Sequence, residues 1–350
     1  MSKSKQHYIA IRPDWLAANR EPILDPGQKI VDPHHHLWDR PGWRYLLDDI
    51  LADIRGTPET GGHDVRATVF VQARAMHRAD GPEAMQPVGE TEFANGIAAM
   101  CASGGYGDVR VCAGIVSFAN LALGDAVRPV LEAHERAGGG RFRGIRHILT
   151  WDRDPDLLNP AYTPAEDMMA SDAFRAGFRH LAAMGLSFDA WMYFHQIPRL
   201  IDLARAFPDV PIVLNHLGGI LGIGRYEGKR DEVFPEWQAL MRRLAACPNV
   251  MVKVGGLGMR LPGFGFEDRE HTPDSATLAA TWKPWMETAI ESFGTARCMF
   301  ESNFPVDKGS YGYAAGWNAM KRIAAQATEE EKADLFWRSA TRFYRLPGVA

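Results

Sequence analysis

Short apolar segments alternate with helix-length amphipathic segments along most of this 350-residue chain. Such alternation is typical of βαβ units, in which helices connect parallel strands. Eight candidate strands favour a closed barrel over an open sheet, and no GxGxxG follows the first strand, as a dinucleotide-binding sheet would require. The eight segments are residues 29–32, 67–73, 109–117, 142–150, 187–195, 211–216, 249–255 and 297–303.

The pattern therefore predicts an α/β protein with a (β/α)₈ TIM barrel as a single domain. We expect an N-terminal extension over residues 1–28 and the barrel domain over residues 29–350. Two long strand-to-helix connections, residues 74–88 and 256–275, would lie on the catalytic face, where such loops often act as lids. The clearest helices are expected at residues 89–102, 198–206, 281–293 and 329–344.

Charge and composition limit the kinds of partner. The formal net charge is −4 and no block of basic residues occurs, so nucleic acid and anionic membranes are poor candidates. No segment approaches membrane-spanning length, and four cysteines without CxxC spacing fit a reducing compartment. We expect a cytoplasmic protein that acts on a small molecule. Its state as a monomer or homo-oligomer is left open.

The segment Asp32-Pro-His-His-His-Leu-Trp38 is the most informative motif. On a strand, residues two apart project to the same side, roughly 6–7 Å apart, so His34 and His36 would point together into the barrel mouth while His35 points away. Two converging imidazoles can bind a divalent metal, orient a substrate or transfer protons. Their place at the end of the first strand makes them the leading candidates for the active site.

Two later strands carry further histidines. In the fifth strand, Tyr193 and His195 share a face with Asp189 that should point inward, and the sixth strand ends at His216. We expect Tyr193 to contact substrate, His216 to be catalytic, and His195 to be a third metal ligand beside the first pair. A purely structural role is the alternative for both histidines.

The last two strands carry charged side chains. Glu301 and Asn303 would share the inward face of the eighth strand, and Lys253 is bracketed by valines in the seventh. Because an unpaired buried charge is costly, Lys253 and Glu301 are expected to form an ion pair. The sharper hypothesis is that Glu301 handles protons and Lys253 contacts the substrate.

Two side chains on other strands could hold the substrate. Arg146 lies toward the end of the fourth strand, where its guanidinium could bind a carboxylate through two hydrogen bonds. Gln72 ends the second strand and could add a neutral hydrogen bond. Together they favour a small, oxygen-rich, anionic substrate.

At this point the chain resembles a known family. Four motifs in this order are similar to the amidohydrolase-related family of the amidohydrolase superfamily, and more narrowly to the branch of sugar lactonases and 2-pyrone-4,6-dicarboxylate lactonase. The resemblance covers nearly everything from residue 29 onward and implies a (β/α)₈ barrel with hydrolase activity. The motifs are Asp32-Pro-His-His-His36, Gly144-Ile-Arg146, Phe207-Pro-Asp-Val-Pro-Ile-Val-Leu-Asn-His-Leu-Gly-Gly219 and Arg297-Cys-Met-Phe-Glu-Ser-Asn-Phe-Pro305.

The resemblance also implies roles. His34 and His36 match the pair that ligates metal in metal-dependent members and contacts substrate in metal-free ones, and His216 matches a histidine that is often catalytic. Asn303 falls where relatives usually carry a water-activating aspartate. An amide cannot act as a general base near neutral pH, so Glu301 or a histidine would have to take over. Asp307, beyond Pro305, is expected to turn away.

The leading hypothesis is hydrolysis of a lactone or related cyclic ester in a small carboxylated or sugar-derived molecule. Hydrogen-bond donors alone can stabilise the oxyanion of so reactive an ester, so one divalent ion such as Zn²⁺ and metal-free catalysis both stay open. Two alternatives remain. One is a metal-dependent decarboxylase of an aromatic or muconate-type acid, and the other is a catalytically inactive ligand-binding barrel.

Overall fold

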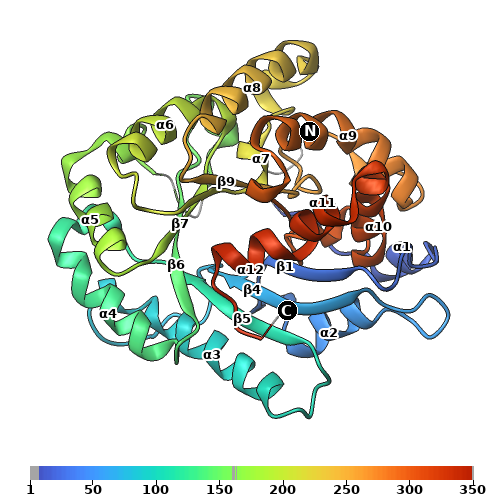
Figure 1. The fold of residues 1–350 in the computed structure, drawn as a ribbon, viewed down its shortest axis with the longest axis horizontal. Helices are drawn as coiled ribbons and strands as arrows, with labels where there is room; N and C mark the ends of the chain where they lie inside the picture. The colour runs from blue at the N-terminus through green and yellow to red at the C-terminus, as the bar shows by residue number, and fades with distance from the viewer. Residues whose placement is uncertain (1–7, 160–161, 163, 349–350) are drawn as a thin grey trace.

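The computed structural model describes residues 8–159, 162 and 164–348 and shows eight parallel strands in a nearly closed barrel with helices around it (Figure 1). The predicted barrel is therefore confirmed. Two short strands, β2 (Trp38–Arg40) and β3 (Trp43–Tyr45), form a separate antiparallel pair. The barrel strands, in spatial order, are β1 (Lys29–His35), β4 (Asp64–Val71), β5 (Arg110–Ser117), β6 (Phe142–Ile148), β7 (Ser187–Trp191), β8 (Ile212–Leu214), β9 (Val250–Val254) and β10 (Cys298–Phe300).

Every predicted strand segment overlaps a strand, but several strands stop earlier than expected. β7 ends at Trp191 rather than at residue 195, and β10 ends at Phe300 rather than at residue 303. His216 and Asn303 have φ angles of 54° and 55°, so the backbone turns away from the strand direction there. Strand alternation therefore cannot place the side chains that follow these ends.

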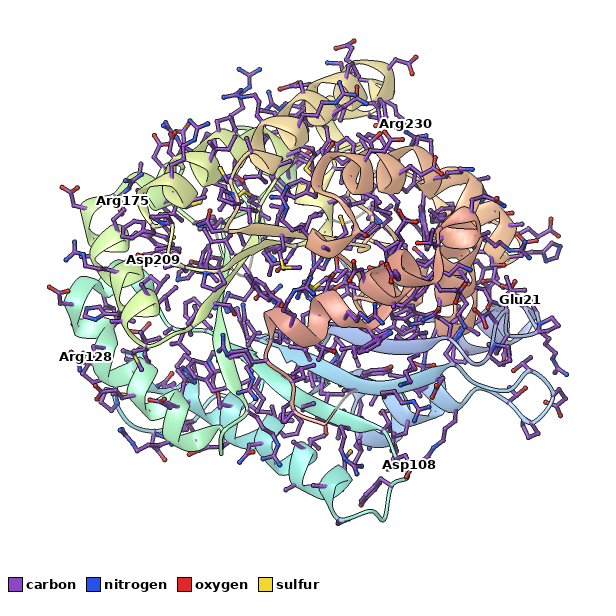
Figure 2. The ribbon with its side chains drawn as sticks, in the orientation of Figure 1. Glu21, Asp108, Arg128, Arg175, Asp209 and Arg230 are labelled. Atoms are coloured by element: carbon purple, nitrogen blue, oxygen red, sulfur yellow. The ribbon has the colours of Figure 1, made fainter. Side chains whose placement is uncertain are left out.

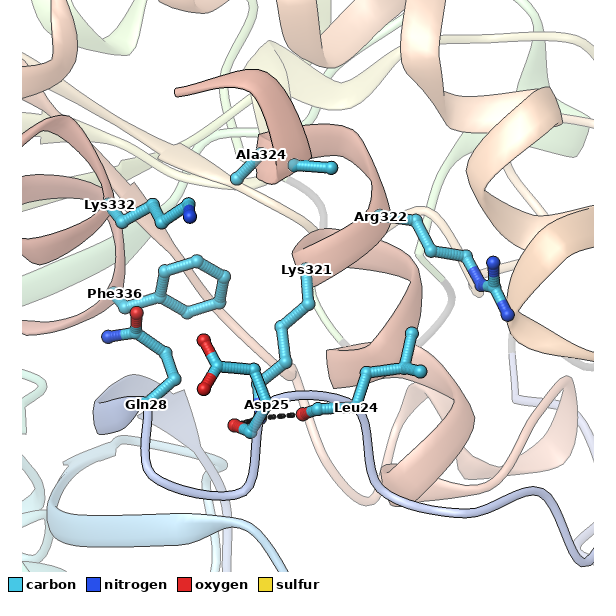
Figure 3. Close-up of a pocket in the computed structure, with 9 residues that line it drawn as sticks. Leu24, Asp25, Gln28, Lys321, Arg322, Ala324, Lys332 and Phe336 are labelled. Atoms are coloured by element: carbon cyan, nitrogen blue, oxygen red, sulfur yellow. Dashed lines mark hydrogen bonds between the residues drawn. The ribbon is translucent and has the colours of Figure 1, made fainter. Parts of the chain in front are cut away.

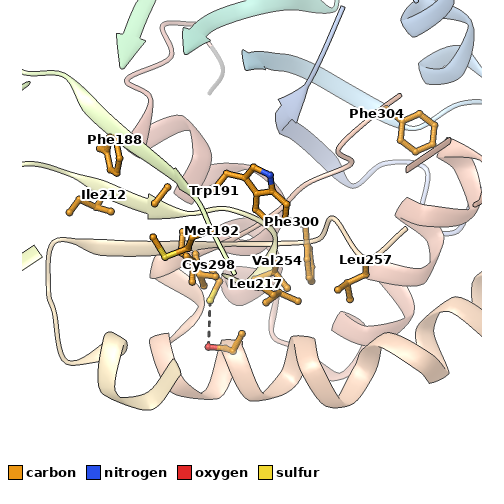
Figure 4. Close-up of a cluster of buried hydrophobic side chains, with 14 of the residues drawn as sticks. Phe188, Trp191, Met192, Ile212, Leu217, Val254, Leu257, Cys298, Phe300 and Phe304 are labelled. Carbon is orange, nitrogen blue, oxygen red and sulfur yellow. Dashed lines mark hydrogen bonds between the residues drawn. The ribbon is translucent and has the colours of Figure 1, made fainter. Parts of the chain in front are cut away.

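Apolar side chains fill both sides of the barrel wall. Phe188, Ile212 and Phe300 belong to the large buried cluster that includes side chains of the outer helices (Figure 4). A smaller cluster inside the barrel contains Val69 and Met299, together with Tyr344 from the C-terminal segment. Strands buried on both faces must be continuously apolar, which explains why they appear as short hydrophobic runs.

The helices follow the predictions closely except at two places. α9 begins at Ser275 rather than at residue 281, because the Asp274 side chain accepts a hydrogen bond from the Thr277 backbone N–H and caps it. The segment predicted at residues 329–344 is interrupted by a π-helical turn, Asp334–Arg338. The helices are α1 (Pro13–Ala17), α2 (Leu47–Arg55), α3 (Val88–Ala102), α4 (Arg128–Ala137), α5 (Asp172–Ala183), α6 (Ile197–Ala206), α7 (His216–Gly219), α8 (Arg230–Ala245), α9 (Ser275–Phe293), α10 (Tyr313–Ile323), α11 (Glu329–Ala333) and α12 (Ser339–Phe343).

The surface and the helices have ordinary polar character. Charged side chains such as Asp108, Arg128 and Arg230 lie at the outer edge of the molecule (Figure 2). Among the described helices, none has both the length and the apolar character that crossing a membrane requires.

The N-terminal segment is hydrogen-bonded to the connection between β9 and α9 and to α10. Arg12 donates to the Glu267 carbonyl at 2.7 Å, in the connection between β9 and α9. Lys321 of α10 donates to the Leu24 and Asp25 carbonyls at 2.7 and 2.8 Å, beside a cavity of about 340 Å³ (Figure 3). The segment therefore supports one of the two long loops on the face where the strands end.

Candidate active site

A carboxylate lies between two imidazoles where the strands end. Glu301 Oε1 is 2.7 Å from His216 Nδ1, and Glu301 Oε2 is 2.9 Å from His34 Nδ1. The backbone N–H of His216 also donates to Glu301 Oε1 at 3.1 Å. All three side chains are buried, and their potential ligand atoms lie within 4.8 Å of one another. One carboxylate thus orients a histidine near the end of β1 and a histidine that follows β8.

His36 belongs to the same cluster. Its ring centroid lies 4.9 Å from that of His34, which in turn lies 4.4 Å from that of His216. His36 Nδ1 is 2.7 Å from the Val71 carbonyl oxygen, which can only accept, so this nitrogen carries the proton and Nε2 is left as a base. His35 points away, with Nε2 2.8 Å from Thr68 Oγ1. The structure therefore brings His34, His36, His216 and Glu301 together.

Burial sets the charges of this cluster. It lowers the pKa of His34, His36 and His216 well below the ordinary histidine value. The nearby charge of Arg146 lowers all three pKa values further, and the charge of Lys253 lowers those of His34 and His216. The three imidazoles are therefore neutral near pH 7. Burial also raises the pKa of Glu301 to about 8, although the Lys253 charge opposes this shift.

Lys253 does not pair with Glu301, so that prediction was wrong. Its ammonium group forms an ion pair with Asp189 at 2.8 Å, donates to the Pro33 carbonyl at 2.8 Å and approaches His34 Nδ1 at 3.2 Å. Inside a barrel, inward-facing side chains from several strands meet, so the partner of a charge need not lie on the adjacent strand. Lys253 is fully buried, and these bonds hold its ammonium group beside the His34 ring.

Asp189 also accepts hydrogen bonds from two other side chains. Its Oδ2 atom accepts hydrogen bonds from Asn215 Nδ2 at 3.1 Å and from the Tyr344 hydroxyl at 2.8 Å. Tyr344 follows α12, whose neighbouring side chains pack inside the barrel. The C-terminal segment therefore helps to hold Asp189, which is the ion-pair partner of Lys253.

The structure places Tyr193 and His195 outside the histidine cluster. The Tyr193 hydroxyl is buried and donates to the Leu157 carbonyl. His195 Nε2 lies 2.9 Å from Asp152 Oδ2, and the described residues that could hold a metal together are His34, His216 and Glu301. Because β7 ends at Trp191, the inward alternation expected for these two side chains no longer applies.

Asp307 returns to the strand end, contrary to the expectation that it turns away. Its Oδ1 atom accepts a hydrogen bond from Asn303 Nδ2 at 2.7 Å, and its Oδ2 atom accepts from the Gly258 N–H at 2.8 Å and the Tyr311 hydroxyl at 2.7 Å. The backbone turns at Asn303, whose φ angle is 55°, and the Asp307 N–H donates to the Asn303 carbonyl at 3.2 Å, which brings the two side chains together. Burial raises the pKa of Asp307 to about 7.

Arg146 and Gln72 lie together beside the cluster. The buried Arg146 guanidinium donates to the Gln72 backbone carbonyl, and burial lowers the Arg146 pKa to about 10. A residue that sequence reasoning missed lies close by. Glu90 is fully buried and accepts from the Ala73 N–H at 2.7 Å, and burial raises its pKa to about 7. Glu90 lies within α3 rather than at a strand end, so no strand motif pointed to it.

The family follows from a comparison with known proteins. Residues 31–346 match the family model described as Amidohydrolase. The chain belongs to the amidohydrolase family. This membership confirms the resemblance that the motifs indicated and assigns the chain to the hydrolases of that family.

Several relatives match this amidohydrolase over nearly their whole length. It is 32% identical over 340 residues to the uncharacterized protein y4mH of Sinorhizobium fredii, covering 91% of this chain and 98% of that protein. It is 27% identical over 330 residues to an L-fucono-1,5-lactonase of Burkholderia ambifaria, covering 90% of this chain and 95% of that enzyme.

Two solved structures share the fold. A zinc-bound amidohydrolase of Burkholderia multivorans has a TM-score of 0.69 at 23% identity, covering 91% of this chain and 99% of that chain. A protein proposed to be a 2-pyrone-4,6-dicarboxylic acid hydrolase of Pseudomonas putida has a TM-score of 0.61 at 15% identity, covering 91% and 98%. At these identities the likeness concerns the fold alone.

Proposed function

We propose that this amidohydrolase adds water to the lactone ring of a small carboxylated or sugar-derived molecule. The observation that carries the proposal is Glu301, which lies between the Nδ1 atoms of His216 and His34 at 2.7 and 2.9 Å. Two relatives named L-fucono-1,5-lactonase, at 27% and 25% identity, support the lactone as substrate.

The residues of the cluster can carry out this reaction without a metal. His216 is neutral, and with its Nδ1 proton directed at Glu301 its Nε2 atom can take a proton from water. The water oxygen adds to the lactone carbonyl carbon, the ring C–O bond breaks, and the ring oxygen receives the proton from His216, giving a hydroxy acid. Because burial raises the pKa of Glu301 to about 8, its ionised form increases as the pH rises toward that value, and in this form the carboxylate stabilises the positive charge that His216 carries in between.

Arg146 supplies a donor for the developing negative charge. Its Nε–H is buried and has no hydrogen-bond partner among the described residues. The guanidinium is held in place by its bond to the Gln72 carbonyl, so it needs no rearrangement when the carbonyl oxygen becomes anionic.

The same residues fit one divalent ion such as Zn²⁺. The Nε2 atom of His34 is buried and without a hydrogen-bond partner among the described residues, while the Nδ1 atoms of His36 and His216 face acceptors. This arrangement is typical of metal-binding histidines. His34 and His216, the two histidines that lie close enough to bind one ion together with Glu301, would hold it, and His36 is the candidate for a further ligand. When bound, the ion would polarise the lactone carbonyl. Glu301 keeps its orienting role in either form, because it faces Nδ1 atoms.

The test combines a metal count with a substrate panel. Elemental analysis of unchelated protein gives the number of divalent ions per chain. If one is found, we expect His34→Asn to lose it and His195→Asn to keep it. We expect acid release from aldonic lactones or carboxylated pyrones, and a fall of about 10²–10⁴-fold for His216→Gln with the fold intact by circular dichroism.

Other outcomes on the panel would contradict the proposal. Release of CO₂ from aromatic acids without lactone opening would indicate a decarboxylase. Thermal stabilisation by a panel compound that is never turned over would indicate a ligand-binding barrel.

A further inference from the structure

A cavity of about 190 Å³ lies beside the histidine cluster, where β4 ends. Its wall comes from the segments after β4, β5 and β6, and Gln72 lies next to Val71, whose carbonyl holds His36. The side chains that matter are Gln72, Arg74, His77, Phe118, Ile148 and Tyr162. None of these has a role in the lactone chemistry described above.

Gln72 presents a hydrogen-bond donor without an acceptor. Its side-chain oxygen accepts from the Arg74 backbone N–H at 3.1 Å, which fixes the orientation of the amide. Its Nε2 atom is then left buried and has no hydrogen-bond partner among the described residues. A buried donor without a partner costs about 1–3 kcal/mol, so a bound acceptor that satisfies it would be stabilised.

The surroundings of Gln72 are cationic. Arg146 and Arg40 donate to the backbone carbonyls of Gln72 and Ala73, and Arg74 follows directly and lines the cavity. Two acids lie near these arginines. Glu83 lines the cavity and is exposed to solvent, whereas Glu90 is buried and its Oε1 atom is occupied by two backbone N–H groups. Burial raises the pKa of Glu90 to about 7, which reduces its negative charge near neutral pH. These charges favour an anion.

The backbone here is strained in a way that suits a binding site. Arg74 and Met76 have φ angles of 57° and 53°, a left-handed conformation that non-glycine residues rarely adopt. Such outliers cluster at functional sites because the surrounding structure must hold them in place.

The other side of the cavity is apolar and aromatic. Phe118 and Ile148 line it, and the Arg74 guanidinium lies 5.1 Å from the centre of the Tyr162 ring. A flat ring could pack against these side chains while a carboxylate attached to it reaches Gln72 and Arg74.

We propose that the Gln72 cavity is a subsite that binds the carboxylate end of a cyclic substrate, with Gln72 Nε2 and the Arg74 guanidinium as donors. The inference rests on the proposed function in one respect, since it takes the histidine cluster as the reacting centre. It narrows the substrate to a ring that carries a carboxylate away from the lactone carbonyl.

The larger cavity beside α10 provides a useful contrast. It is lined by Lys321, Lys332 and Arg322, and the position of Lys321 beside Leu24 and Asp25 can be seen in Figure 3. Lys321 Nζ already has the Leu24 and Asp25 carbonyls and His63 Nδ1 as partners, at 2.7 to 3.0 Å, while Lys332 pairs with Glu329 and Arg322 donates to Ser275. A satisfied ammonium group has no proton left for a ligand. The difference between the two cavities is the unpartnered donor on Gln72.

The test is a binding measurement that needs no turnover. Isothermal titration calorimetry compares 2-furoate with furfuryl alcohol, two probes of similar size that differ in charge. We expect the protein to bind 2-furoate at least about tenfold more tightly than the alcohol. Gln72→Leu and Arg74→Gln should each weaken furoate binding about tenfold, while binding of the alcohol changes less than about twofold.

Arg78→Gln is the matched control, because Arg78 lies on the same loop, is exposed and pairs with Glu92. It should leave furoate binding unchanged. Equal binding of the two probes, or equal losses in Arg78→Gln and Arg74→Gln, would overturn the proposal. Arg74 is exposed, so its variant keeps the test valid even if Gln72→Leu fails to fold.

The subsite and the proposed function can fail separately. Furoate selectivity in a protein that opens no lactone would leave the subsite standing and remove the lactonase. Lactone hydrolysis without furoate selectivity would support the lactonase and overturn the subsite. Glu301→Gln should lose hydrolysis and still bind 2-furoate.

Discussion

Asp189 and Glu301 are both fully buried inside this barrel, and their partners differ. Asp189 accepts hydrogen bonds from Lys253, Asn215 and Tyr344, and among these three donors Lys253 also approaches His34. Glu301 faces two imidazoles, each with a second nitrogen on the far side of the ring. Asp189 is bonded to buried donors and therefore stabilises the fold. Glu301 orients two histidines whose second ring nitrogens can still contact a substrate. Variants of the two carboxylates should therefore separate stability from activity.

The largest effect is expected for Glu301→Gln. An amide carries no negative charge, so the positive charge that forms on His216 during the reaction would lose the carboxylate that lies 2.7 Å from its Nδ1 atom. We expect kcat/KM on the lactone substrate to fall about 10³-fold or more, with thermal unfolding at or above that of the parent enzyme. A fall of less than about tenfold would contradict the role given to Glu301.

Asp189→Asn should have the opposite profile. It leaves the ammonium group of Lys253 buried without a counter-charge, and breaking a buried pair in this way costs about 3–5 kcal/mol. Urea unfolding should show this loss. Adding Lys253→Met to Asp189→Asn should recover part of it, since the unpaired charge is then gone. A loss below about 1 kcal/mol would show that the pair is not needed.

The difference in stability between the parent protein and Glu301→Gln should depend on pH. Burial raises the Glu301 pKa from 4.5 to about 8, so the folded protein binds this proton more tightly than the unfolded chain. The resulting stability is complete below pH 4.5 and is lost as the pH rises toward 8. In chelated protein, the unfolding free energy of the parent relative to Glu301→Gln should fall by up to about 1.4 kcal/mol per pH unit in this window. A constant or rising difference would contradict the assignment.

The smallest effect is expected for Tyr344→Phe. This change removes one hydrogen bond to Asp189 and leaves the ring in place inside the barrel. We expect a loss of about 1–2 kcal/mol in urea unfolding and an unchanged KM. A change in activity larger than about threefold would mean that the two carboxylates are coupled through Lys253 and His34.

The sequence by itself was sufficient for the barrel and for the centre of the site. The alternation of apolar runs and amphipathic helices is a local property, and so is the spacing that places His34 and His36 on one side of a strand. The family motifs indicated His216 as a site residue and showed that Asn303 stands where relatives usually carry an aspartate. These features depend on residues close together in the chain, so they can be read without knowing the packing.

Only the tertiary structure decided which side chains meet. Lys253 pairs with Asp189 rather than with Glu301, and Asp307 accepts a hydrogen bond from Asn303. His195 lies outside the histidine cluster because β7 ends four residues earlier than expected. Each outcome depends on where a strand stops and on which inward side chains share one layer of the barrel. Those are properties of the closed barrel as a whole, set by packing between segments far apart in the chain.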